Sequence, residues 1–145
     1  MDITNFIKQI EQQHKEQDAL YHEVALKYSL SDTVMWVLYI LCRSEEPLTQ
    51  QGLCQQGYLP KQTINSAVNS LVKKGMVQLE VIPGTRNQKK IVLTDEGKAF
   101  SEKTIHNLIS AEKQAYKNLS DEEREIYLKL TSKITASLRE EFKGL

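Results

Sequence analysis

The sequence predicts a mainly α-helical fold that contains one small β-hairpin. Apolar residues recur three and four positions apart over most of the 145 residues, as on the buried side of an amphipathic helix. Apolar and polar residues alternate at residues 77–81, and a turn-forming stretch, PGTRNQKK, follows soon after. With 40% hydrophobic residues, a chain of this length has enough apolar material for one domain with a real core.

Composition and the N-terminal residues predict a cytoplasmic protein that does not enter a membrane. Charged residues make up 26% of the sequence, and no run of 18 apolar residues occurs. The first residues, MDITNFIKQI, lack the continuous hydrophobic stretch of a signal peptide. The two cysteines do not form a CxxC motif, which agrees with a reducing compartment.

The first elements are three helices. A long amphipathic helix is expected over residues 1–30. Its apolar stripe begins with Ile3, Phe6, Ile7 and Ile10. Ser31 is a suitable N-cap for DTVMWVLYILCRS, a helix that is apolar nearly all round and is therefore expected to be buried. Thr49 can cap a short helix, QQGLCQQ, which stops at Gly57.

A fourth helix and the hairpin come next. The helix lies within LPKQTINSAVNSLVKKG, residues 59–75, and Gly75 ends it. Its buried stripe is expected to consist of Ile64, Val68, Leu71 and Val72. Residues 77–81 form the first strand, and IVLT returns as the second strand with Ile91 and Leu93 facing the core.

Two further helices complete the chain. Thr94, followed by two acids, is expected to start one long connecting helix over residues 94–117, a rod of about 35 Å. Ser120 and Glu123 form a capping box that opens the last helix. The order of elements predicts a winged helix-turn-helix over residues 31–97, with dimerisation helices at 1–30 and 118–145.

The fourth helix has an unusual outer side. An ordinary solvated helix face carries Glu, Lys, Arg and Gln, whereas this one is rich in Asn, Ser and Thr, which disfavour a helix. Such short polar side chains suit a recognition helix in the DNA major groove, where they can donate to and accept from base edges. The candidates for base contact are Gln62, Thr63, Asn65, Ser66 and Asn69. Lys61, Ser70 and Lys73 are expected to contact phosphates.

Charge is concentrated around this helix. The net charge of the chain is zero, but residues 58–94 contain six basic residues and one acid, Glu80. Residues 47–79 contain no acid, which would repel phosphate. The hairpin turn adds Arg86, Asn87 and Lys89, which suit a wing in the minor groove. The alternative for both elements is an ordinary polar surface facing water.

The middle of the chain resembles the winged-helix core of the MarR family of bacterial transcription regulators. The family pattern is a helix ending in L-x-x-x-G, a wing with an Arg, and then L-T-x-x-G. It corresponds here to Leu71–Gly75, Arg86 and Leu93–Gly97. Thr85 and Asn87 depart from it, because the family's wing usually has an Asp before the Arg and a second basic residue after it.

The resemblance implies a sequence-specific, ligand-responsive, homodimeric repressor that binds a near-palindromic operator in double-stranded DNA and needs no cofactor. The residues also favour a dimer, because two-fold pairing of the terminal helices would bury their apolar stripes. The alternative is that these stripes cover the chain's own core. An alternative to the function is a winged-helix module that binds protein instead of DNA.

Aromatic and metal-binding residue types suggest two further hypotheses. Members of the family often respond to small aromatic ligands, oxidants or metals. A ligand pocket is the hypothesis for Tyr21, Tyr28, Trp36 and Tyr39, although aromatics at such spacing are commonly plain core. His14, Asp18 and His22 share one helix face, but a surface role is favoured over a metal site.

Neither the cysteines nor any sequence motif predicts a reactive or catalytic site. Cys42 and Cys54 are expected to be small buried hydrophobes, and the oxidant-sensing branch of the family carries its reactive cysteine in the N-terminal helix, where this chain has none. No sequence motif predicts catalysis.

Overall fold

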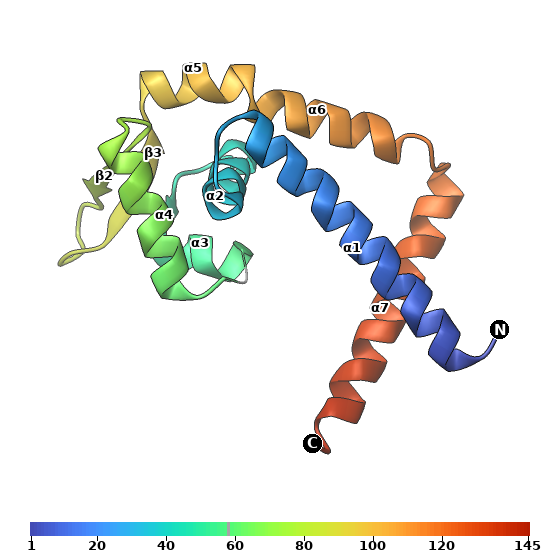
Figure 1. Ribbon diagram of the computed structural model, residues 1–145. Coiled ribbons are helices and arrows are strands. Elements are labelled where there is room, and N and C mark those ends of the chain that lie inside the picture. The colour runs from blue at the N-terminus through green and yellow to red at the C-terminus, as the bar shows by residue number, and fades with distance from the viewer. Residues whose placement is uncertain (58) are drawn as a thin grey trace. The chain divides into compact units, whose positions relative to one another are not determined.

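The computed structural model describes residues 1–57 and 59–145. Tyr58, the first residue of the basic segment 58–94, lies outside the described residues. Most of the chain is helical, with a small antiparallel sheet of strand order β1-β3-β2, so the predicted fold class is confirmed (Figure 1). The chain divides into two compact units, Met1–Ile109 and Ser110–Leu145, which are described separately.

Two helices open the first unit, and side chains cap both of them. Helix α1 spans Ile3–Lys27 and helix α2 spans Asp32–Arg43. The Ser31 hydroxyl accepts a hydrogen bond from the Val34 amide, as the sequence predicts. Helix α2 is buried on most sides and provides Met35, Val37 and Leu38 to the centre of the core, because its apolar residues leave no polar face.

The helix-turn-helix consists of α3 (Gln50–Gly57) and α4 (Lys61–Lys73), both of which pack on α2. The Thr49 hydroxyl accepts from the Gly52 amide at 3.0 Å, which confirms the predicted cap. The N-cap of α4 is Pro60, whose carbonyl accepts from the Ile64 amide but whose side chain cannot accept a hydrogen bond.

The buried side of α4 differs from the prediction at one position. Ile64, Val68 and Leu71 are buried as expected, but Val72 is 39% exposed. Ala67 takes its place in the core. At about 100° per residue, Ala67 lies 60° from Ile64 on the side opposite to Val68 and Val72. The centre of the buried stripe is therefore shifted away from Val72.

The sheet contains one strand more than the predicted hairpin. Strands β2 (Val77–Val81) and β3 (Lys89–Leu93) pair antiparallel, with Leu79 opposite Ile91. Strand β1, Leu48–Thr49, pairs with the other edge of β3. A strand of two residues is too short to show an alternating pattern, so β1 is not predictable from the sequence. The turn is also shorter than expected, because Lys89 and Lys90 belong to β3.

A compact set of hydrogen bonds joins α4, the hairpin and the next helix. Gly75 has φ +74°, and the Met76 amide donates to the Leu71 carbonyl, a Schellman ending of α4. The Thr94 hydroxyl donates to the Gly75 carbonyl at 2.5 Å and accepts from the Gly97 amide at 3.0 Å. The two glycines and the threonine of the sequence pattern therefore meet at one point.

The connecting helix expected as one rod over residues 94–117 is divided. Helix α5 spans Asp95–Lys103, helix α6 spans Ile105–Tyr116, and Thr104 between them has φ −130° and ψ −75°. The Thr104 hydroxyl donates to the Phe100 carbonyl at 2.8 Å, while the Thr104 amide donates to the Ser101 carbonyl. The hydroxyl thus satisfies the carbonyl that the amide of a continuous helix would use.

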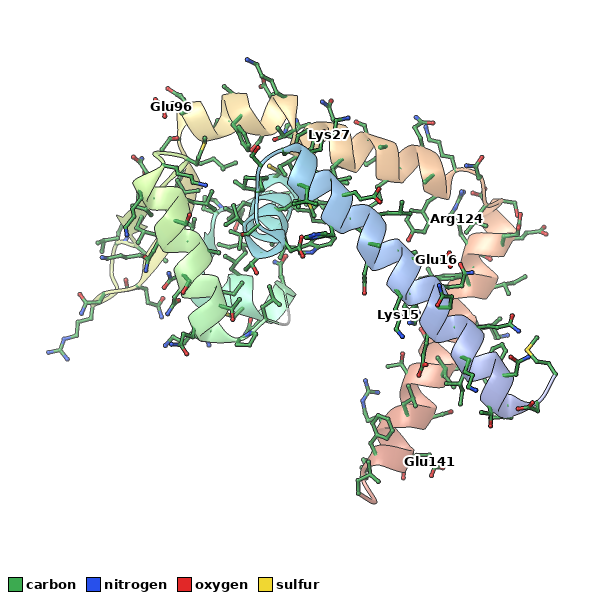
Figure 2. The ribbon with its side chains drawn as sticks, viewed as in Figure 1. Lys15, Glu16, Lys27, Glu96, Arg124 and Glu141 are labelled. Carbon is green, nitrogen blue, oxygen red and sulfur yellow. The ribbon has the colours of Figure 1, made fainter. Side chains whose placement is uncertain are left out.

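The second unit consists of the end of α6 and helix α7 (Asp121–Phe142). Ser120 and Glu123 form the predicted capping box at the start of α7. Arg124, in the first turn of α7 (Figure 2), donates to the carbonyls of Tyr116 and Leu119 and forms an ion pair with Asp121. These contacts hold the turn between α6 and α7 without buried apolar residues.

Among the described residues, no single helix is long and apolar enough to cross a membrane. Helices α1 and α2 meet that test only when taken together, and they are bent by 90° at the break between them.

Gly97 offers a test of the close packing between the start of α5 and the segment that links α4 to the hairpin. A Cβ at Gly97 would lie 1.9 Å from the Met76 carbonyl oxygen, a backbone atom that cannot move without breaking its bond to the Thr94 amide. We expect Gly97→Ala to lower the free energy of unfolding by about 3 kcal/mol or more, measured by urea denaturation. Gly52→Ala in α3, where the added Cβ meets atoms only at 3.4 Å and beyond, should be neutral or stabilising. Equal effects of both substitutions would contradict this account.

Candidate nucleic-acid interface

The outer side of α4 is polar and open to solvent. Gln62, Thr63, Ser66 and Asn69 are exposed, whereas Asn65 is half-buried. The Ser66 hydroxyl donates to the Gln62 carbonyl at 3.0 Å, so its lone pairs remain free to accept from a ligand. By helical spacing Gln62 lies nearly opposite the centre of the buried stripe, with Ser66 and Asn69 on either side of it, and Thr63 and Ser70 lie on one flank.

The other flank of α4 faces a groove of about 860 Å³. Helix α3, helix α4 and the hairpin all contribute to its walls. From α4 come Lys61, Asn65 and Asn69. Two of the five residues predicted to face bases therefore line a groove, and the remaining three lie outside it.

Asn65 is the most constrained of the predicted contact residues. Its Oδ1 atom is shielded from solvent and, within the described part of the chain, has no hydrogen-bond partner. Buried polar atoms in folded proteins are nearly always paired. Asn65 is thus unsatisfied at a position that borders the groove.

The tip of the hairpin is a tight turn that ends in an exposed arginine. The Thr85 amide donates to the Ile82 carbonyl across Pro83 and Gly84, and Gly84 has φ +81°, as in a type II turn. The Thr85 hydroxyl donates to the same carbonyl at 2.7 Å. Thr85 thereby braces the turn from its own side chain, and Arg86 next to it is exposed.

Most of the positive charge of this segment is unpaired. Glu80 is its one acid, and the Glu80 carboxylate lies 3.6 Å from the Lys90 ammonium and accepts from the Gln78 amide. The other cations form no ion pair among residues 1–57 and 59–145. They are Lys61, Lys73, Lys74, Arg86 and Lys89.

The structure adds groove residues that the sequence did not single out. Gln50 and Gln51, in the first turn of α3, and Gln88, in the hairpin, line the same groove as Asn65. Their position depends on the packing of α3 against α4, which no local pattern reveals. The absence of acids over residues 47–79 was the available signal, and it includes the start of α3.

The four aromatic residues of the ligand hypothesis are only partly brought together. Tyr21 and Trp36 have ring centroids 5.0 Å apart, and Trp36 meets Tyr39 edge-on at 5.1 Å. A cavity of about 470 Å³ lies beside Trp36 and Tyr39 and extends toward the end of α3. Tyr21 and Tyr28 do not line it. The cavity therefore lies between α2 and the end of α3, and only two of the four predicted aromatic residues line it.

His22, which the metal hypothesis groups with His14 and Asp18 on α1, contacts helix α2. Its Nδ1 atom lies 2.7 Å from Asp32 Oδ1, so it bridges α1 and α2. In the described residues no three histidine, cysteine or acidic side chains form a group that could hold a metal ion.

Comparison with known proteins gives a family match for the middle of the chain. Residues 28–86 match the MarR family. They include α2, α3, α4, β2 and the hairpin tip with Arg86. No curated protein matches the sequence significantly.

Solved structures match nearly the whole chain. NMB1585, a MarR family regulator from Neisseria meningitidis, has a TM-score of 0.80 at 17% identity, over 99% of this chain and 98% of its own. The Staphylococcus aureus MepR–DNA complex has a TM-score of 0.67 at 19% identity, over 95% of this chain and 98% of its own. Staphylococcus aureus MarR in complex with salicylate and kanamycin has a TM-score of 0.70 at 16% identity, over 95% of this chain and 93% of its own. At these identities the likeness establishes the fold.

Cys42 and Cys54 are half-buried and not fully buried as the sequence predicts, and Cys42 provides a test of the packing around α2. Burial raises the pKa of the Cys42 thiol, so at pH 8 the folded protein holds less of the reactive thiolate than the unfolded chain. In a Cys54→Ser background, we expect iodoacetamide to modify Cys42 several-fold more slowly in the folded protein than in guanidinium chloride. The difference should narrow as the pH rises. Faster modification of the folded protein would contradict a buried thiol.

Proposed function

We propose that this chain, which belongs to the MarR family over residues 28–86 and has the fold of that family's regulators along nearly its whole length, is a DNA-binding transcription regulator. We further propose that it acts as a homodimeric repressor of a near-palindromic operator and responds to a small-molecule effector. The observation that carries the proposal is the exposed, acid-free polar side of α4 beside a hairpin with an exposed arginine at its tip.

The chemistry of the surface fits duplex DNA. Gln62 and Ser66 present hydrogen-bonding groups that can match base edges in a major groove. Lys73 at the end of α4 and Arg86 at the hairpin tip supply positive charge, and the Glu80 carboxylate is paired with Lys90. The MepR structure, which has the same fold, was determined with DNA. We therefore assign base reading to α4 and minor-groove contact to the hairpin tip.

The dimer is proposed on the apolar residues of the terminal helices. Helix α7, all of which the structure describes, has no buried residue. Its stripe of Ile126, Leu130, Ile134 and Leu138 is between 44% and 59% exposed. At the start of α1, Ile3, Phe6, Ile7 and Ile10 are also exposed. Pairing with a second copy would remove these side chains from water, and each fully buried aliphatic side chain is worth about 1.5–3 kcal/mol.

A dimer explains how an effector would control DNA binding. Two recognition helices must lie one helical turn apart, roughly 34 Å, to read adjacent major grooves. A ligand that binds better to a dimer with another spacing lowers its affinity for DNA. The cavity beside Trp36 and Tyr39 adjoins α3 and is our candidate for the effector site. Staphylococcus aureus MarR was determined with salicylate and kanamycin.

The salt dependence of duplex binding tests the proposal. We expect the logarithm of the affinity for short duplexes of random sequence to fall steeply with the logarithm of the salt concentration. Lys89→Gln should reduce this slope by about 0.9, the value for one lost phosphate contact. Lys15→Gln on α1 (Figure 2) is the matched control and should leave the slope unchanged. A chain that binds no duplex at low salt would instead be a protein-binding module.

The oligomeric state tests the dimer. We expect Ile134→Glu to weaken self-association on the order of a hundredfold, measured by sedimentation velocity, because it places a charge within the apolar stripe of α7. Ser132→Glu adds the same charge on the opposite side of the helix and should have little effect. A wild-type chain that is monomeric at all concentrations, or equal effects of the two substitutions, would refute this interface.

A further inference from the structure

We infer that the groove between α4, α3 and the hairpin holds one sugar–phosphate strand of the bound duplex, and that Asn65 and Asn69 contact this strand instead of bases. This inference rests on the proposed function and refines the roles of residues within it. It changes the expectation for two of the five α4 residues that the sequence marks for base contact.

The placement of the groove leads to this conclusion. A recognition helix occupies the major groove, and the tip of the hairpin reaches the adjacent minor groove. In a duplex, a single sugar–phosphate strand separates one major groove from the neighbouring minor groove. That strand must pass between the two protein elements, and the space between α4 and the hairpin is the groove that Asn65 and Asn69 line.

The two walls carry groups that suit phosphate oxygens. Lys61 lies on the α4 wall and Lys89 on the hairpin wall. The amides of Gln51 and Asn87 add neutral donors from α3 and from the hairpin. Of the described residues that line the groove, none is acidic. A polyanionic strand would therefore meet positive charge and hydrogen-bond donors on both sides.

The lining also includes less polar side chains. Leu79 of β2 and Cys54 of α3 contribute to it. Deoxyribose is the least polar part of the strand, and it has no charge to be satisfied. A groove with polar walls and some apolar lining matches the alternation of phosphate and sugar along one strand.

The state of Asn65 separates strand binding from base reading. To read adenine, an Asn side chain must accept from the N6 amine with its oxygen and donate to N7 with its amide nitrogen. The Oδ1 atom of Asn65 is shielded from solvent, so a base edge cannot reach it. The Nδ2 hydrogens are then the groups that Asn65 can offer, and donors alone are what a phosphate oxygen requires.

Three matched substitutions test the inference, each of which converts an amide to a carboxylate. Asn65→Asp and Asn87→Asp place the new charge on opposite walls of the groove, whereas Gln62→Glu places it on the outer side of α4. For each variant, selection from a pool of random duplexes gives the base preference at every position, and titration of the selected duplex gives the affinity.

We expect Asn65→Asp and Asn87→Asp to lower the affinity for all sequences by the same factor, about tenfold or more, with the wild-type base preference retained. A methylphosphonate at one position of the strand removes the opposing phosphate charge and should restore most of the affinity. Gln62→Glu should instead change the preferred base at one position, in favour of cytosine, whose N4 amine donates to a carboxylate.

Two results would overturn the inference alone: a changed base preference for Asn65→Asp and Asn87→Asp, or the absence of rescue at every methylphosphonate position. If the half-buried Asn65→Asp variant does not fold, as judged from its melting curve, the exposed Asn87→Asp variant decides the question by the same criteria. A wild-type chain that binds no duplex would overturn the proposed function, and this inference with it.

Discussion

The close approach of the Gly97 backbone to the Met76 carbonyl is the contact on which the geometry of the interface depends. Only hydrogen fits between them, because a Cβ would lie 1.9 Å from the oxygen. At the same point the Thr94 hydroxyl joins the end of α4 at Gly75 to the start of α5 at Gly97. Helix α4, the base of the hairpin and helix α5 are therefore fixed relative to one another by a few backbone atoms.

The hairpin register transmits this arrangement to the interface. Val77 pairs with Leu93 next to the Thr94 contact, and Val81 pairs with Lys89 at the far end, where the turn begins. Since a slip by one residue would exchange the two faces of the sheet, the buried Ile91 fixes which side chains reach the groove. The same register brings Lys90 opposite Glu80, so the one acid of the segment is neutralised within the hairpin.

The sequence was a good guide wherever the structure depends on local chemistry. The caps at Ser31, Thr49, Thr94 and Ser120 all form, since each needs only an oxygen within three residues of an amide. Sequence reasoning missed what depends on neighbours that are distant in the chain. Strand β1 exists because β3 is there to pair with it. The helical spacing of apolar residues continues through Thr104, so it does not mark the break between α5 and α6. Periodicity located the polar side of α4 but could not show that Asn65 lies against a groove, because α3 and the hairpin form its other walls.

The start of α4 at Pro60 has an energetic consequence. A Ser, Asp or Asn at that position would accept from a first-turn amide and contribute about 1 kcal/mol, which proline cannot do. The amide hydrogens of the first turn of α4 consequently have no side-chain acceptor within the cap, in contrast to those of α2, where Ser31 provides one. The first turn of α4 is thus open to an acceptor from outside the helix, and an anion that settled there would supply one. Because such an anion would also stabilise the turn that binds it, the stability of this turn and the affinity for the anion are linked.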